Sequence, residues 1–141
     1  MPAAENSVIV NRPRSEVFSF VANHENDAKW RPGVLDITRA SGEGVGAVYR
    51  QGVKGPMGRR ISADFEVTAH EQNSHIAFRT LSGPVRPEGS YRFEDADGGT
   101  RVTFSLSANL RGVQKLMSPM VSRSMRSEVG ALENLKRVLE S

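Results

Sequence analysis

The amino-acid sequence predicts a single α+β domain in which a curved antiparallel β-sheet of about seven strands wraps around a long C-terminal α-helix. Its 141 residues are enough for one domain, residues 1–141, and too few for two domains of ordinary size. The middle of the chain alternates apolar and polar residues between turn signals, whereas the last part has a helical period. A strongly twisted sheet can enclose one long helix on its concave face.

The N-terminal segment predicts an edge strand followed by a short helix. Residues 7–10 are a short apolar run. Pro13 suits the first turn of a helix because its missing N–H needs no partner there. Four apolar residues then share one helical face: Val17, Phe18, Phe20 and Val21. They predict a helix of about three turns that ends near Asn23.

The next part of the chain predicts six consecutive antiparallel strands without an intervening helix. These strands are expected over residues 34–39, 47–53, 61–67, 76–81, 88–94 and 102–107. Residues 61–67 alternate strictly between apolar and polar, which is typical of a strand with one buried and one exposed face. Gly98 and Gly99 predict a hairpin turn before the last strand, because glycine tolerates positive φ. The strands therefore form a meander.

The C-terminal part predicts one amphipathic helix from Pro119 to Glu140, preceded by residues that follow the same period. Its apolar residues step by three and four: Val113, Leu116, Met117, Met120, Val121, Met125, Val129, Leu132, Leu135 and Leu139. Such a helix is roughly 33 Å long, which is the width of a small domain. Pro119 either kinks the helix or occupies its first turn behind a Ser118 cap.

A single helix fills the concave face of such a sheet only in part, so the remaining space is either packed with side chains or left as a ligand cavity. Aromatic residues make up only 6% of the chain. Several methionines on the helix suit an adaptable apolar surface, although they serve equally well as core fillers. Trp30 either packs against the rim of the sheet or contacts a ligand. We expect eight residues to line a pocket, with Tyr49 and Trp30 towards its mouth: Trp30, Tyr49, Phe65, Phe78, Tyr91, Phe104, Met120 and Met125.

Five stretches of the chain carry a resemblance to a known superfamily. They are VIVNRPRSEVFSFV at 8–21, KWRPGV at 29–34, GVGAVY at 44–49, GGTRVT at 98–103 and LENLKRVLE at 132–140. Their order and spacing resemble the START-like, or Bet v 1-like (SRPBCC), superfamily over essentially the whole chain. More narrowly, the chain is similar to bacterial members of the polyketide cyclase/dehydrase type. The resemblance implies the helix-grip fold, and it implies no single chemistry, because this superfamily includes cyclases, lipid carriers, hormone receptors and co-chaperones.

Three functions follow from this resemblance. The first is binding of a small hydrophobic molecule, lipid-like or polyketide-like, in an internal cavity between the sheet and the C-terminal helix. The second is an aromatic polyketide cyclase or dehydratase that uses the same cavity, with Tyr49, Tyr91, Arg79 or His24 as proton donors. No acid/base pair matches a known catalytic motif, so no catalytic residue is assigned. The third is an interaction protein similar to Hsp90 activators, which would use the basic face of the helix.

Composition argues against several other classes. The absence of cysteine removes disulfides and thiolate chemistry, and His70 and His75 are five residues apart rather than the four of a helical zinc motif. We therefore expect no metal and no other cofactor. The net charge is +3 with arginines spread along the chain, which predicts a solvated surface and no nucleic-acid partner. No apolar run could span a membrane and no signal peptide is visible, so we expect a cytoplasmic monomer or homodimer.

Overall fold

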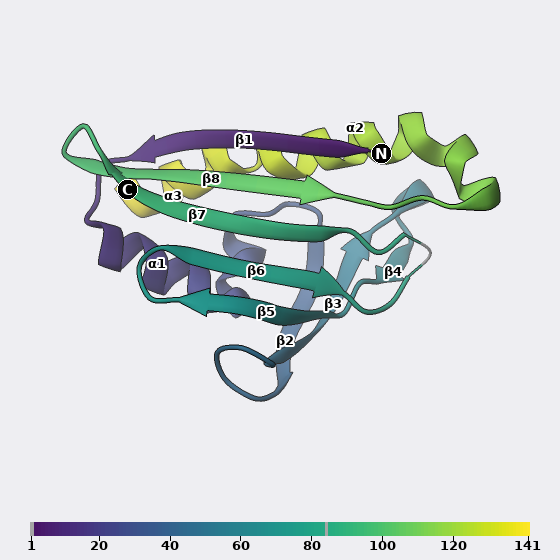
Figure 1. The fold of residues 1–141 in the computed structure, drawn as a ribbon, viewed down its shortest axis with the longest axis horizontal. Helices are drawn as coiled ribbons and strands as arrows, with labels where there is room; N and C mark the ends of the chain where they lie inside the picture. Colours follow the sequence, from purple (N-terminus) through teal and green to yellow (C-terminus); the bar gives the residue numbers. More distant parts are fainter. Residues whose placement is uncertain (1, 84) are drawn as a thin grey trace.

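The structure, a computed structural model, describes residues 2–83 and 85–141, without the side chains of residues 56, 113 and 114. In these residues an antiparallel sheet curls around the interior, and its strand order is β1-β8-β7-β6-β5-β3-β2, with the short β4 paired to β3 (Figure 1). The strands are β1 (Ala3–Val10), β2 (Val34–Ser41), β3 (Val48–Lys54), β4 (Arg60–Ser62), β5 (Phe65–Glu71), β6 (His75–Thr80), β7 (Glu88–Ala96) and β8 (Gly99–Ser107). The predicted sheet and the edge position of the first strand are thus confirmed.

Helical segments lie between and after these strands. They are α1 (Arg14–Ala22), η1 (His24–Lys29), η2 (Pro56–Gly58), η3 (Gly112–Met117), α2 (Ser118–Gly130) and α3 (Leu132–Glu140). The last two run along β1 and form the long C-terminal helical arm of the helix-grip fold (Figure 1). Pro119 occupies the first turn of α2 and does not kink it.

The C-terminal arm differs from the prediction in one respect, because α2 and α3 are separated at Ala131. The Ala131 N–H donates to the carbonyl of Glu128 at 3.1 Å, and the Asn134 N–H donates to the carbonyl of Ala131 at 2.9 Å. These three-residue steps tighten the backbone relative to an α-helix. The arm nevertheless continues along β1, as Figure 1 shows.

The strand predicted over residues 61–67 is in fact two strands, β4 and β5. The backbone N–H of Gln51 in β3 donates to a carboxylate oxygen of Asp64 at 3.0 Å instead of to a strand carbonyl. The Ala63 N–H donates back to the Gln51 carbonyl at 2.8 Å. The Asp64 side chain therefore replaces one backbone hydrogen bond between the strands. The alternation of residues 61–67 does not reveal this interruption.

Polar contacts attach the helical arm to β1. Asn6 donates from Nδ2 to the carbonyl of Val129 at 3.1 Å. Lys136 donates from Nζ to the carbonyl of Ile9 at 2.6 Å and to Glu140 at 2.8 Å, and Glu140 in turn accepts from the Asn11 N–H at 2.7 Å. The arm is thus held against the edge strand at two places along its length.

The hairpin predicted between β7 and β8 is present, but its two residues with positive φ are Asp97 and Gly98 rather than Gly98 and Gly99. Asp97 has φ 47° and Gly98 has φ 78°, as in a type I′ turn. Gly99 has no positive φ, but a Cβ built there would lie 2.3 Å from the carbonyl oxygen of Val10.

We therefore expect Gly99→Ala to lower the free energy of unfolding by about 1–3 kcal/mol, because the new methyl group presses on the backbone of β1. Denaturant unfolding measures this change.

Gly130→Ala is the control for this substitution. A Cβ at Gly130 meets no atom within 4 Å, and Gly130 lies at the end of α2. There alanine should leave stability unchanged or raise it by up to about 1 kcal/mol, because it is the better helix former. A Gly99→Ala variant as stable as the Gly130→Ala variant would contradict the close approach of β1 and the hairpin.

Candidate functional site

A row of aromatic rings crosses the interior side of the sheet. It takes one ring from each of five successive strands in the sheet order: Tyr49 in β3, Phe65 in β5, Phe78 in β6, Tyr91 in β7 and Phe104 in β8. Successive ring centroids are 5.2, 5.5, 6.1 and 4.4 Å apart. These five side chains, the aromatic row, were all predicted to face one pocket, and they do lie together. Because they touch, a ligand bound here must separate some of the rings.

Trp30 packs over one end of the aromatic row. Its ring centroid lies 6.1 Å from that of Tyr91 and 6.2 Å from that of Phe104, both edge to face. Only 2% of Trp30 is exposed. The side chain thus lies inside the molecule, and its predicted place towards the mouth of a pocket is wrong.

The two methionines predicted to line the pocket have different surroundings. Met125 is buried with Val121 and Val129 on α2. Met120 is 57% exposed, so its prediction as a pocket residue is wrong. The buried residues of α2 recur every four positions, and Met120 is turned about 100° from Val121 around the helix axis. The side chain of Val113, which was assigned to the same stripe, lies outside the described part.

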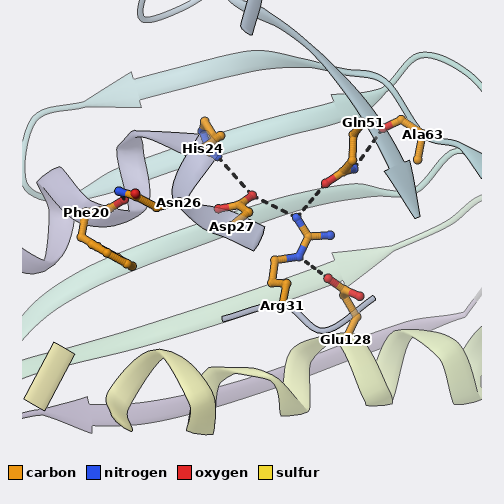
Figure 2. A network of polar contacts seen from close by, with 8 residues as sticks. All are labelled: Phe20, His24, Asn26, Asp27, Arg31, Gln51, Ala63 and Glu128. Carbon is orange, nitrogen blue, oxygen red and sulfur yellow. Dashed lines mark hydrogen bonds and ion pairs between the residues drawn. The ribbon is translucent and has the colours of Figure 1, made fainter. Parts of the chain in front are cut away.

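Beside the aromatic row lies a buried polar cluster drawn from four segments (Figure 2). Arg31 donates from Nη1 to Asp27 Oδ2 at 2.9 Å and to Gln51 Oε1 at 3.0 Å. From Nε it donates to Glu128 of α2. Gln51 completes the chain by donating from Nε2 to the Ala63 carbonyl at 3.0 Å. We call Asp27, Arg31, Gln51 and Glu128 the polar cluster.

The end of η1 holds the central arginine in place. The N–H groups of Trp30 and Arg31 both donate to the Asp27 carbonyl, at 3.2 and 2.8 Å. Burial alone would lower the pKa of Arg31, but the carboxylates of Glu128 and Asp27 raise it above the ordinary value. The guanidinium is therefore a permanent positive charge inside the protein, balanced by one buried carboxylate and one that reaches the surface.

Three buried polar atoms have no hydrogen-bond partner among the described residues: Asp27 Oδ1, Trp30 Nε1 and Tyr91 Oη. Burial raises the pKa of Tyr91 well above its ordinary value, and the charge of Asp27 adds to this effect. The phenol therefore keeps its proton and can donate a hydrogen bond. Buried polar atoms without a partner each cost about 1–3 kcal/mol, so these three atoms are unfavourable for the stability of the folded protein alone.

An open hollow of about 400 Å³ lies at the Tyr49 end of the aromatic row. Its lining includes Phe18, His24, Tyr49 and His70. Tyr49, predicted near the mouth of the pocket, thus borders open space, and burial raises its pKa. His24 lies between this hollow and the polar cluster, with Nδ1 3.7 Å from Asp27 Oδ2.

Arg79 is not part of the interior, although it was considered as a proton donor. Its guanidinium pairs with Glu66 on the neighbouring strand, with 2.8 Å between Nη2 and Oε1, and 57% of its side chain is exposed. It therefore lies on the outer side of the sheet.

The polar cluster itself was missed from the sequence, although two of its members leave a signal. Glu128 lies three residues after Met125 and four before Leu132, so it occupies a position of the buried helix stripe. Gln51 lies two residues after Tyr49 and therefore on the same side of β3. A charged or amide side chain at a buried position indicates a polar partner inside.

Comparisons with known proteins agree with this architecture. Residues 1–140 match the family described as "Polyketide cyclase / dehydrase and lipid transport". No protein of the curated collection matches the sequence significantly.

Solved structures with the same fold cover nearly the whole chain. TTHA0849 from Thermus thermophilus has a TM-score of 0.83 at 20% identity, over 98% of this chain and 97% of that one. The Zhui aromatase/cyclase from a Streptomyces species has a TM-score of 0.73 at 21% identity, over 98% and 93%. A START superfamily protein from Mycobacterium smegmatis has a TM-score of 0.74 at 16% identity, over 97% and 98%. At these identities the likeness establishes the fold.

Proposed function

Because the chain belongs to the polyketide cyclase/dehydrase and lipid transport family, we propose that it binds a small, mainly apolar molecule between the sheet and the C-terminal arm. The observation that carries this proposal is the group of three unpartnered polar atoms beside the aromatic row. A cavity ligand is typically held by apolar walls and oriented by a few polar groups. The aromatic row and Met125 supply the walls, and the unpartnered atoms supply the orientation.

We infer the chemistry of the ligand from the same three atoms. Trp30 Nε1 and Tyr91 Oη are donors, whereas Asp27 Oδ1 is an acceptor. Ligand oxygens would accept from these donors, and a ligand hydroxyl would donate to the aspartate. Flat rings would stack between the rings of the aromatic row. We therefore propose an oxygenated, ring-containing ligand of polyketide type.

Uptake of this ligand requires the interior to open, and the contacts between the C-terminal arm and the segment after η1 mark the place. Glu128 pairs with Arg31, and Asn134 donates from Nδ2 to the Trp30 carbonyl at 3.2 Å. When both contacts break, the segment that holds Trp30 and Arg31 is free to move away from the arm, and the Trp30 ring moves with it. Because the side chain of Glu128 is 26% exposed, water can solvate it when the pair separates.

Tyr91→Phe tests the proposal because it separates stability from binding. Removing an unpartnered buried hydroxyl should leave the free energy of unfolding unchanged or raise it by about 1 kcal/mol. The same change should weaken binding of 1-naphthol, an oxygenated two-ring probe, by about tenfold, since one hydrogen bond is lost. Trp30 is the sole tryptophan, so quenching of its fluorescence reports occupancy directly.

Tyr49→Phe is the control, because Tyr49 lies at the far end of the row and borders the open hollow. We expect it to bind 1-naphthol like the parent protein. Equal losses in both variants, or a Tyr91→Phe variant that binds as tightly as the parent, would contradict the assignment of Tyr91. If the probe leaves Trp30 fluorescence unchanged, no ligand of this size reaches the interior.

A second function, cyclisation or dehydration of a polyketide, is favoured by the same polar atoms. Enolisation needs a proton donor at a ligand oxygen and a base near the adjacent carbon. Tyr91 and Asp27 have those two chemical characters. We expect a cyclase to accelerate exchange of the α-protons of 1-tetralone with D₂O, followed by NMR, and Tyr91→Phe to abolish the acceleration. If the protein binds 1-tetralone but does not accelerate the exchange of its α-protons, the function is ligand binding and transport rather than catalysis.

A further inference from the structure

Three chain segments carry positive charge without any negative charge. They are residues 54–60, 81–87 and 108–126. Together they hold eight of the 19 Lys and Arg residues and none of the 16 Asp and Glu residues: Lys54, Arg59, Arg60, Arg86, Arg111, Lys115, Arg123 and Arg126. The rest of the chain has 11 basic residues against 16 acidic ones and is therefore net negative.

The strand order brings these segments to one end of the sheet. The segment before β7 lies against β4, because the hydroxyl groups of Ser62 and Ser82 are 3.0 Å apart. Glu88 at the start of β7 pairs with Ser107 at the end of β8, so the segment after β8 leaves the sheet beside it. Figure 1 shows the β3–β4 connection and the segment between β8 and α2 at the right-hand end. We call this end, with its eight basic residues, the basic end.

Acidic groups at this end offset part of this charge. Asp64 follows β4 and acts electrostatically on Arg60, and Glu5 of β1 lies opposite Ser105 near the end of β8. Asp36 of β2 binds Arg60 through two hydrogen bonds of 2.8 Å. Glu88 is exposed at the first position of β7. Lys54, Arg59 and Lys115 are exposed in the connections themselves. The basic end therefore keeps a net positive charge, opposite in sign to the rest of the molecule.

Exposed apolar side chains lie in the same chain segments as these charges. Met57 is 97% exposed, Leu116 85% and Met120 57%. Met57 also has φ 59°, a left-handed backbone that L-residues with side chains rarely adopt. Exposure of a large apolar side chain at the tip of a turn is unfavourable in water. It is favourable where the tip meets an apolar phase.

We propose that the basic end docks on an anionic lipid surface. Basic side chains are attracted by anionic headgroups, and the exposed aliphatic tips insert at the headgroup boundary. Nucleic acid fits less well, because single strands are held by exposed aromatic side chains and the described part of the chain exposes none. Among the described helices, none has the length and hydropathy of a membrane span. This docking is independent of what the interior binds.

The proposal is tested by co-sedimentation of the whole protein with vesicles. We expect binding to phosphatidylcholine vesicles that contain about 30% phosphatidylglycerol, and little binding to pure phosphatidylcholine. The pair of changes Arg59→Glu and Lys115→Glu should weaken binding by about 25-fold or more, since each lost positive charge weakens it about fivefold. Met57→Asn with Leu116→Gln should weaken the binding that persists at high salt. Both sites are exposed, and asparagine tolerates a left-handed backbone.

Arg92→Glu with Arg101→Glu is the matched control, because it makes the same change of charge on exposed residues of β7 and β8. It should retain most of the binding. Equal losses from the two charge reversals would overturn the proposal, as would no binding to anionic vesicles at low salt. Tighter binding to short DNA than to vesicles, unaffected by Met57→Asn and Leu116→Gln, would assign the basic end to nucleic acid instead. If the interior site exists, 1-naphthol should still quench the Trp30 fluorescence of every variant, so the two proposals can be tested separately.

Discussion

Asp27→Ala is expected to lower the free energy of unfolding by about 3–5 kcal/mol, the cost of removing one partner from a buried ion pair. Asp27 is 1% exposed and is the only fully buried carboxylate that contacts Arg31 in the described part of the chain. Without Asp27, the Arg31 guanidinium still contacts the neutral Gln51 and the partly exposed Glu128. These two groups compensate the buried positive charge less well than the buried carboxylate does. Thermal and denaturant unfolding measure the loss.

Two further variants show whether this loss comes from the uncompensated charge. Asp36→Ala removes a carboxylate from an exposed pair with Arg60, where solvent screens the interaction, and it should change stability much less. Asp27→Leu combined with Arg31→Met removes both charges and should recover most of the stability, as apolar replacements of buried pairs often do. If the double variant is as unstable as Asp27→Ala, the cost lies in packing and not in charge.

Leu132→Ala is expected to cost about 2–5 kcal/mol, the range for deletion of a fully buried leucine. Leu132 is 0% exposed and begins α3, where it is buried together with Val129 and Leu135. Leu116→Ala, in η3 before the arm and 85% exposed, should cost less than about 0.5 kcal/mol. A Leu132→Ala loss below about 1 kcal/mol would mean that the arm is not packed on the sheet as described.

The fold was predictable because its main signals are local. Alternation along each strand and the stripe of α2 and α3 depend on nearby residues, and both were interpreted correctly in outline. Errors arose where a tertiary contact overrides the local pattern. Asp64 interrupts the strand predicted over residues 61–67 by accepting the Gln51 N–H. Met120 was assigned to the apolar stripe of the helix, but the packing of α2 buries Val121, Met125 and Val129 and turns Met120 towards solvent.

The site was predictable only in its apolar half. The aromatic row follows from alternation, because each of its five strands places a ring on the buried side, and β7 places two, Tyr91 and Phe93. The polar cluster joins residues 27, 31, 51 and 128, whose distances along the chain carry no periodic signal. The basic end was missed for a related reason. Its charges look dispersed along the sequence, and only the antiparallel order of the strands gathers the three connections at one end.

The edge position of β1 has a consequence for how the protein is made. Among the strands, β1 pairs only with β8, and Val8 lies opposite Val102. During synthesis β1 therefore has no partner until β8 has been made, and the C-terminal arm that covers it is made later still. At about 5–20 residues per second, translation leaves this strand unpaired for roughly 5–20 s after it emerges. The meander from β2 to β8 can form from neighbouring hairpins in that time. The nascent chain therefore has to keep the apolar end of its first strand from pairing wrongly until β8 has been synthesised.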